Sequence, residues 1–291
     1  MSIQDVTTTT AVRTDRVVVE GDELVFDVRG TGAPIILLPG TPGDASAYGL
    51  IAEPLAVDRT VVTYDPRGFG RSTGREPRQY EIGQQARDVV AVLRAAGLER
   101  AQVFGNSAGA EVGLELAKHH PEVVDGLVVH EPPVIRVLPD ADDFRARIAE
   151  IHRTAWTEGP KPAFFDFLVL TQLPFNEGEP FSQAEVDALR PNLDALPGLD
   201  FADFYVKSQM LPLTEYAPAL AAIAENGVQV VAGAGELSLD LPFGRTSRRI
   251  ADELGVPFVT FPGHHGSHTD PATADAWLAT LRRALAALAA R

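Results

Sequence analysis

Short apolar runs alternate with longer amphipathic stretches in the first 130 residues, and this alternation narrows the choice of folds more than any other feature. The pattern reads βαβαβαβ, with runs typical of strands at 34–39, 60–64, 101–104 and 124–129, and helical stretches at 45–56, 80–96 and 108–119. A right-handed crossover returns each strand in parallel beside its predecessor. The sequence therefore predicts an α/β fold with a mostly parallel sheet covered by helices on both faces.

Two further segments complete the predicted sheet. Before the alternating region, 16–20 and 23–29 read as an antiparallel hairpin that turns at Gly21-Asp22. After Pro132-Pro133 the rhythm stops, and 134–225 holds helical stretches but no convincing strand. Strands return at 228–232 and 257–261, with helices at 246–254 and 271–290. We therefore expect an eight-stranded core domain, formed by 1–133 and 226–291, with an inserted helical cap at 134–225.

Composition excludes several classes of function. The chain has 25 Lys+Arg and 40 Asp+Glu, so its net charge of 25 − 40 = −15 disfavours nucleic acid and anionic membranes as partners. It has no cysteine, which excludes disulfides and thiolate nucleophiles. Met1 to Thr10 is polar and lacks the features of a signal peptide, so we expect a cytoplasmic protein. The oligomeric state stays open, a homo-oligomer included.

One pentapeptide has the form of a nucleophile elbow. Gly105-Asn106-Ser107-Ala108-Gly109 lies where an apolar strand runs directly into a helix, which is the context that a G-x-S-x-G motif requires. Such a turn strains the serine backbone and exposes its hydroxyl at a helix N-terminus. The free amide of Ala108 would then stabilise negative charge on a carbonyl attacked by Ser107.

With this motif the chain resembles the α/β-hydrolase fold superfamily over essentially its full length. Leu38-Pro39-Gly40-Thr41-Pro42-Gly43 follows the third strand, where relatives place the loop that donates the second oxyanion-hole amide, although Pro39 replaces their usual histidine. The resemblance implies that the backbone amides of Thr41 and Ala108 form the oxyanion hole. It implies no cofactor.

The resemblance places the catalytic base in a loop after the last strand, at Pro262-Gly263-His264-His265-Gly266-Ser267-His268. Alignment from the Pro-Gly side selects His265, whereas counting back from Asp270 selects His264. We favour His265 and keep His264 as the alternative. A metal site formed by the loop histidines is disfavoured, because no adjacent carboxylate pair completes a ligand set.

The triad acid departs from the commonest pattern of the superfamily. Ser238 occupies the position after the seventh strand where most relatives have aspartate, which leaves Glu236 and Asp240 as off-register substitutes. Glu131 ends the strand next to the one that carries Ser107, and its His-Glu-Pro context resembles the zearalenone-lactonase branch, where such a glutamate orients the histidine. We favour Glu131, with Glu236 and Asp240 as alternatives.

Together these segments predict a serine hydrolase that cleaves a small apolar carboxylic ester or lactone through an acyl-enzyme. A carbon-carbon bond hydrolase of vinylogous diketones and a non-catalytic small-ligand receptor are the alternatives on the same fold. The predicted cap is rich in aromatic residues, some of which we expect to line an apolar pocket. The expected lining residues are Trp156, Phe164, Phe165, Phe204 and Met210.

Overall fold

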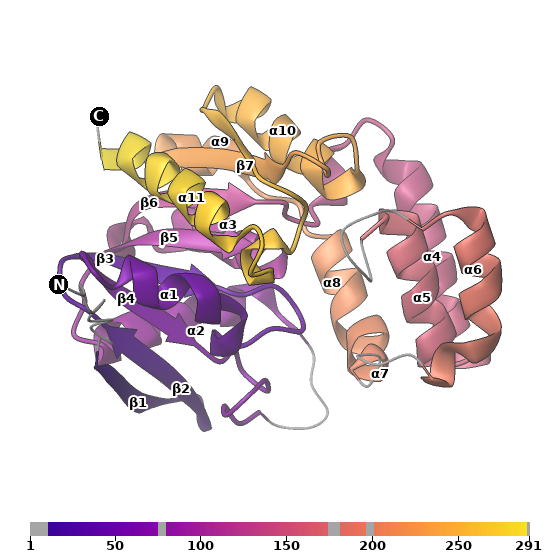
Figure 1. The fold of residues 1–291 in the computed structure, drawn as a ribbon, viewed down its shortest axis with the longest axis horizontal. Coiled ribbons are helices and arrows are strands. Elements are labelled where there is room, and N and C mark those ends of the chain that lie inside the picture. The colour runs from indigo at the N-terminus through magenta and orange to yellow at the C-terminus, as the bar shows by residue number, and fades with distance from the viewer. Residues whose placement is uncertain (1–10, 75–79, 174–180, 196–200, 290–291) are drawn as a thin grey trace, which may run out of the picture.

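A computed structural model of the chain describes residues 11–74, 80–173, 181–195 and 201–289. The segment from Met1 to Thr10, on which the localisation was predicted, lies outside these residues. The described residues form one sheet with helices on both of its faces and a group of further helices to one side (Figure 1). Among the described helices, none combines the length and the hydropathy needed to span a bilayer.

The sheet is the eight-stranded, mostly parallel sheet that the sequence predicted. Its strands lie in the order β1-β2-β4-β3-β5-β6-β7-β8, and all neighbours from β4 to β8 are parallel. The strands are β1 (Val12–Val19), β2 (Asp22–Arg29), β3 (Ala33–Leu38), β4 (Arg59–Tyr64), β5 (Ala101–Asn106), β6 (Val124–His130), β7 (Val230–Gly235) and β8 (Phe258–Phe261).

The opening hairpin of β1 and β2 is antiparallel, as predicted, but its turn lies one residue earlier than expected. Val19 pairs with Asp22, so the two loop residues are Glu20 and Gly21 rather than Gly21 and Asp22. Both have positive φ, 51° and 88°. Two-residue hairpin loops favour this geometry because its twist matches that of the strands.

Helices cover both faces of the sheet because strand residues alternate between them. Ile36 and Leu38 belong to one core cluster, together with residues of α2 (Ile82–Ala95), α3 (Ala108–His119) and α10 (Pro242–Leu254). Ile35 and Leu37 belong to the other cluster, with α1 (Gly49–Leu55) and α11 (Ala274–Ala289). Strands buried on both faces explain why the sequence shows continuous apolar runs there.

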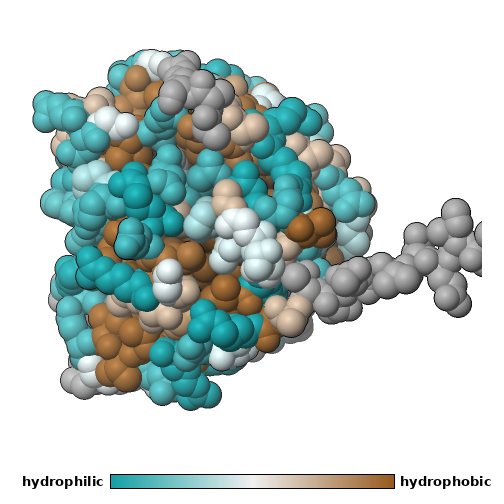
Figure 2. Space-filling view, turned by 90° about the vertical axis from the view of Figure 1, so that its left-hand side faces the viewer, coloured by the Kyte–Doolittle hydropathy of each residue, from teal (hydrophilic) through white to brown (hydrophobic). Residues whose placement is uncertain are grey.

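The helices between β6 and β7 form the group at the side of the sheet, at the right of Figure 1. They are α4 (Ala141–Thr157), α5 (Pro160–Thr171), α6 (Gln183–Leu189), α7 (Ala202–Phe204) and α8 (Met210–Thr214), with a π-helical turn at Tyr205–Gln209 between the last two. The last helix of the segment, α9 (Leu220–Glu225), packs against α3 and α10 of the core instead. On the opposite side of the core, hydrophobic residues are interspersed among hydrophilic ones (Figure 2).

Candidate active site

Ser107 sits on a strained turn between β5 and α3. Its backbone has φ 56° and ψ −125°, a region that residues other than glycine rarely adopt, and its amide donates to the His130 carbonyl oxygen at 2.9 Å. A Cβ on Gly105 would lie 2.4 Å from the Gly109 oxygen, and a Cβ on Gly109 would lie 2.1 Å from the Leu38 oxygen. The two glycines of the motif are therefore required by the close approach of strand, turn and helix.

The loop after β3 lies against this turn. A Cβ added to Gly40 would come within 2.8 Å of the Ser107 Cβ, so glycine lets the loop approach the serine. Among the described residues, neither the Thr41 amide nor the Ala108 amide donates a hydrogen bond to a protein group. Ala108 begins α3, where the helix dipole favours negative charge. Two amides without a described protein partner, beside a half-buried serine, can stabilise an oxyanion.

Glu131 lies directly after β6 and contacts the histidine loop. Its Oε2 is 2.8 Å from His265 Nδ1, and its Oε1 accepts a hydrogen bond from the Gly235 amide at 2.8 Å. The Glu131 amide donates to Ser247 Oγ at 2.9 Å, and the residue has φ 47°. Burial would raise the pKa of this carboxyl, but the hydrogen bonds from His265 and from the Gly235 amide hold the pKa below its ordinary value. An ionised, buried carboxylate therefore faces one nitrogen of the imidazole.

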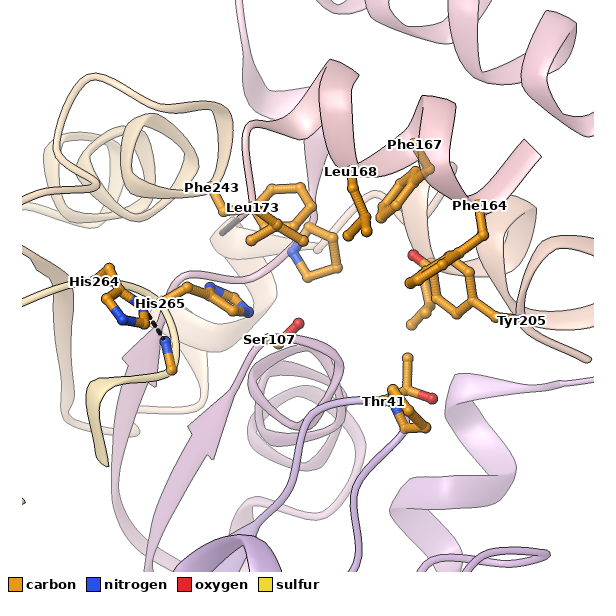
Figure 3. Close-up of a pocket in the computed structure, with 14 residues that line it drawn as sticks. Thr41, Ser107, Phe164, Phe167, Leu168, Leu173, Tyr205, Phe243, His264 and His265 are labelled. Atoms are coloured by element: carbon orange, nitrogen blue, oxygen red, sulfur yellow. Dashed lines mark hydrogen bonds between the residues drawn. The ribbon is translucent and has the colours of Figure 1, made fainter. Parts of the chain in front are cut away.

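The other nitrogen of His265 is left to face the serine. Because Nδ1 contacts Glu131, Nε2 lies at the far side of the ring, and the ring points toward Ser107 in Figure 3. Both side chains line the same cavity. The Ser107 hydroxyl makes no hydrogen bond to the protein within the described residues, so it is free to meet a ligand.

The alternative site residues make different contacts from Glu131 and His265. His264 also lines the cavity, and its Nδ1 accepts a hydrogen bond from the Gly266 amide at 3.1 Å rather than contacting a carboxylate. Glu236 and Asp240 are exposed, and in the described part of the chain neither makes an ion pair or hydrogen bond with a histidine. Glu236 instead accepts from the Gly263 amide at 3.2 Å.

The remaining loop histidine and its neighbours are buried. His268 stacks on Tyr48, with ring centroids 5.3 Å apart, and burial lowers its pKa to about 3. Within the described residues, no group of three or more histidine, aspartate or glutamate side chains is arranged to hold a metal ion. The three loop histidines thus have three different environments.

His130, which the sequence did not identify as a site residue, lies beside Asn106 and Glu131. Its Nδ1 lies 2.7 Å from the Asn106 Oδ1. Since that oxygen accepts, His130 Nδ1 carries the proton, and Nε2 lies 3.9 Å from Glu131 Oε1. Burial lowers the pKa of His130 to about 4, so the ring is neutral. The only sequence signal was its place between an apolar strand and Glu131.

A cavity of about 230 Å³ lies between Ser107 and the helices beyond the sheet. Of the five pocket residues predicted, only Phe164 lines it. Its described lining is Thr41, Pro42, Ser107, Pro133, Phe164, Phe167, Leu168, Leu173, Tyr205, Leu213, Phe243, His264, His265 and Gly266. Figure 3 shows Phe164, Phe167 and Leu168 on one face of α5, over Ser107.

The other four predicted lining residues are corrected by the structure. Trp156 is 65% exposed on α4, where the Lys207 ammonium lies 4.8 Å from its ring centroid. Phe165 points to the other face of α5 and packs on Phe181, because neighbouring helix positions are about 100° apart. Phe204 packs against Phe69, and Met210 is buried away from the cavity.

Comparison with known proteins places the chain among hydrolases. A family model described as "alpha/beta hydrolase fold" matches residues 33–158. The uncharacterized hydrolase YraK of Bacillus subtilis (strain 168) is 26% identical over 257 residues, which are 86% of this chain and 89% of that protein.

Solved structures of similar fold cover nearly the whole chain. The N-acyl homoserine lactone degrading enzyme Est816 superposes with a TM-score of 0.67 at 22% identity, over 92% of this chain and 99% of its own. The enol-lactonase from Burkholderia xenovorans LB400 superposes with a TM-score of 0.65 at 22% identity, over 94% of this chain and 100% of its own. These likenesses establish the fold.

Proposed function

The chain belongs to the α/β-hydrolase fold superfamily, and on that premise we propose that it is a serine hydrolase cleaving a carboxylic ester or lactone. The observation that carries the proposal is the 2.8 Å contact between His265 Nδ1 and the buried Glu131 carboxylate, in a histidine that shares a cavity with Ser107. An imidazole held in this way presents its second nitrogen to the serine hydroxyl.

The proposed reaction has two halves. His265 takes the proton of Ser107 as the hydroxyl attacks the ester carbonyl, and the Thr41 and Ala108 amides hold the oxyanion. His265 then gives the proton to the leaving alcohol, which departs and leaves an acyl-enzyme. A water molecule, deprotonated by His265, attacks the acyl group and releases the acid. Glu131 stabilises the imidazolium that forms in each half.

Four features support an ester or lactone with an apolar, uncharged body as the substrate of this centre. A serine nucleophile favours acyl transfer over the chemistry of related folds that use a carboxylate. The cavity lining is largely apolar, and among its described residues none is lysine, arginine, aspartate or glutamate. The helices α4–α8 act as the cap, since α5 and Tyr205 form the wall that faces Ser107. The position of Glu131 after β6 also agrees with the resemblance to the zearalenone-lactonase branch.

Labelling with a fluorophosphonate probe tests the nucleophile. We expect one adduct per chain, mapped to Ser107 by peptide mass spectrometry, and none in Ser107→Ala. Hydrolysis of p-nitrophenyl hexanoate and of a simple lactone should disappear in the same variant. Folded protein that stays unlabelled at Ser107 would overturn the assignment. Labelled protein that cleaves a vinylogous diketone but no ester or lactone would favour carbon-carbon bond hydrolysis instead. Labelling without any turnover would point to a receptor.

A further inference from the structure

Tyr205 lies on the cap side of the cavity, in a fixed orientation. It begins the π-helical turn Tyr205–Gln209, a conformation that is rare and often found at functional sites. Its ring meets the rings of Phe164 and Phe167 edge-on, with centroids 5.3 and 5.1 Å away, and that of Phe201 at 6.3 Å. Three phenylalanine rings pack edge-on against this ring, so its hydroxyl has little freedom to turn elsewhere.

The hydroxyl of this ring has no hydrogen-bond partner among the residues that the structure describes. Tyr205 is 4% exposed and lines the cavity, and its hydroxyl end points into the space above Ser107 (Figure 3). No described residue gives or accepts a hydrogen bond at this oxygen. Burial raises the pKa of Tyr205 well above its ordinary value, so the group stays a neutral donor. An unpaired hydroxyl in an apolar wall costs free energy that a phenylalanine would avoid.

The other polar groups of the cavity lie on the core side and are already engaged or reactive. The Thr41 hydroxyl donates to Gln209 Oε1 at 2.7 Å, and His264 Nδ1 accepts from the Gly266 amide. Ser107 and His265 form the reactive centre. On the cap side, the other described lining residues are phenylalanines and leucines. Among the described lining residues on the cap side, the Tyr205 hydroxyl is thus the one hydrogen-bond donor, and it is separate from the reacting groups of Ser107 and His265.

We propose that the Tyr205 hydroxyl recognises a second, uncharged oxygen of the substrate, such as a ketone or ether, separated from the scissile carbonyl by an apolar stretch. The inference rests on the proposed function and deepens it, because it names the kind of ester or lactone that the site prefers. A site built to hydrogen-bond such an oxygen discriminates against the analogue that lacks it, since the buried donor is then left unpaired.

The test compares p-nitrophenyl hexanoate with its 4-oxo and 5-oxo analogues. The wild type should prefer at least one oxo ester by roughly tenfold in kcat/KM. In Tyr205→Phe this preference should fall to about one, with the loss confined to the oxo ester. Tyr216→Phe is the matched control, because its hydroxyl donates to Glu115 at 2.8 Å and does not line the cavity. It should keep the wild-type preference.

Two more measurements separate recognition from folding and from turnover. Tyr205→Phe should not lower the Tm, since its hydroxyl has no partner in the described part of the chain, whereas Tyr216→Phe should lower it slightly. Calorimetry with the methyl esters of hexanoic acid and of its 4-oxo and 5-oxo analogues, in a Ser107→Ala background, measures the same preference. It gives the preference as a ratio of Kd values, without any hydrolysis. A preference absent from the wild type, or retained in Tyr205→Phe, overturns the inference. Failure of Ser107 labelling overturns the proposed function alone.

Discussion

Thr41 and Gln209 are joined by a hydrogen bond of 2.7 Å from the Thr41 hydroxyl to the Gln209 side-chain oxygen. Gln209 is fully buried at the end of the π-helical turn, so the bond ties the loop after β3 to the cap. The Gln209 Nε2 atom is buried without a partner among the described residues. The position of the proposed oxyanion amide of Thr41 therefore depends on a residue 168 positions away.

Breaking this bond should slow the reaction more than it weakens substrate binding. We expect Gln209→Leu and Thr41→Val each to lower kcat by roughly tenfold with little change in KM, because a displaced amide stabilises the oxyanion less well. The double variant should lose no more than either single variant, since both remove one interaction. Thr214→Val, which removes a buried hydroxyl bonded within α8, is the control. Multiplicative losses in the double variant would contradict the link.

Replacement of the proposed acid should abolish most of the activity. Glu131→Gln removes the charge that faces His265, and we expect kcat to fall by about 10³- to 10⁴-fold, as neutralisation of a triad acid does elsewhere. Glu236→Gln, at the exposed carboxylate after β7, should change kcat by no more than about twofold. Steady-state kinetics with p-nitrophenyl hexanoate measure both. The reverse order of effects would move the acid to Glu236.

The two neighbouring histidines should behave differently. His265→Gln removes the base, so turnover and fluorophosphonate labelling of Ser107 should both be lost. His264→Gln keeps an acceptor near the Gly266 amide, and we expect it to retain activity within roughly tenfold of the wild type. Labelling that survives in His265→Gln and disappears in His264→Gln would assign the base to His264.

Acid should destabilise the fold through its buried histidines. Burial lowers the pKa of His268 to about 3, below its ordinary value of 6.5, so the unfolded chain binds this proton more readily than the native state. The stability that results is complete above pH 6.5 and is lost as pH falls toward 3, by about 1.4 kcal/mol per pH unit.

The measurement is urea unfolding of the wild type and His268→Phe between pH 7.5 and 5. The variant keeps an aromatic ring against Tyr48 and Trp277 but cannot take up the proton. As the pH falls from 7.5 to 5, the free energy of unfolding of the wild type should therefore decrease by about 2 kcal/mol more than that of the variant. His130 still titrates in both proteins, so neither curve becomes flat. Parallel curves would show that His268 is not the group responsible.

Local patterns in the sequence were sufficient to predict the fold. They were also sufficient to predict the strand ends at which the residues of the proposed triad lie. Alternating apolar runs predicted the parallel sheet, because strands buried on both faces need continuous apolar residues. Gly105 and Gly109 predicted the turn at Ser107, and a Cβ added at either position would collide with backbone atoms. The position of Glu131 beside Ser107 followed from strand order, since the ends of the adjacent parallel strands β5 and β6 lie side by side. Its contact with His265 depends on the loop after β8, which is two strands away from β6.

The tertiary structure alone decided which side chains face the cavity. Phe164 and Phe165 are neighbours of the same type, yet the first lines the cavity and the second packs against Phe181, because rotation of α5 about its axis is set by packing against distant helices. The same holds for Tyr205 and Gln209, whose directions come from the π-helical turn. The residues of a strand indicate which of its faces are buried. The orientation of a cap helix with apolar residues on several sides is instead set by the elements that pack against it.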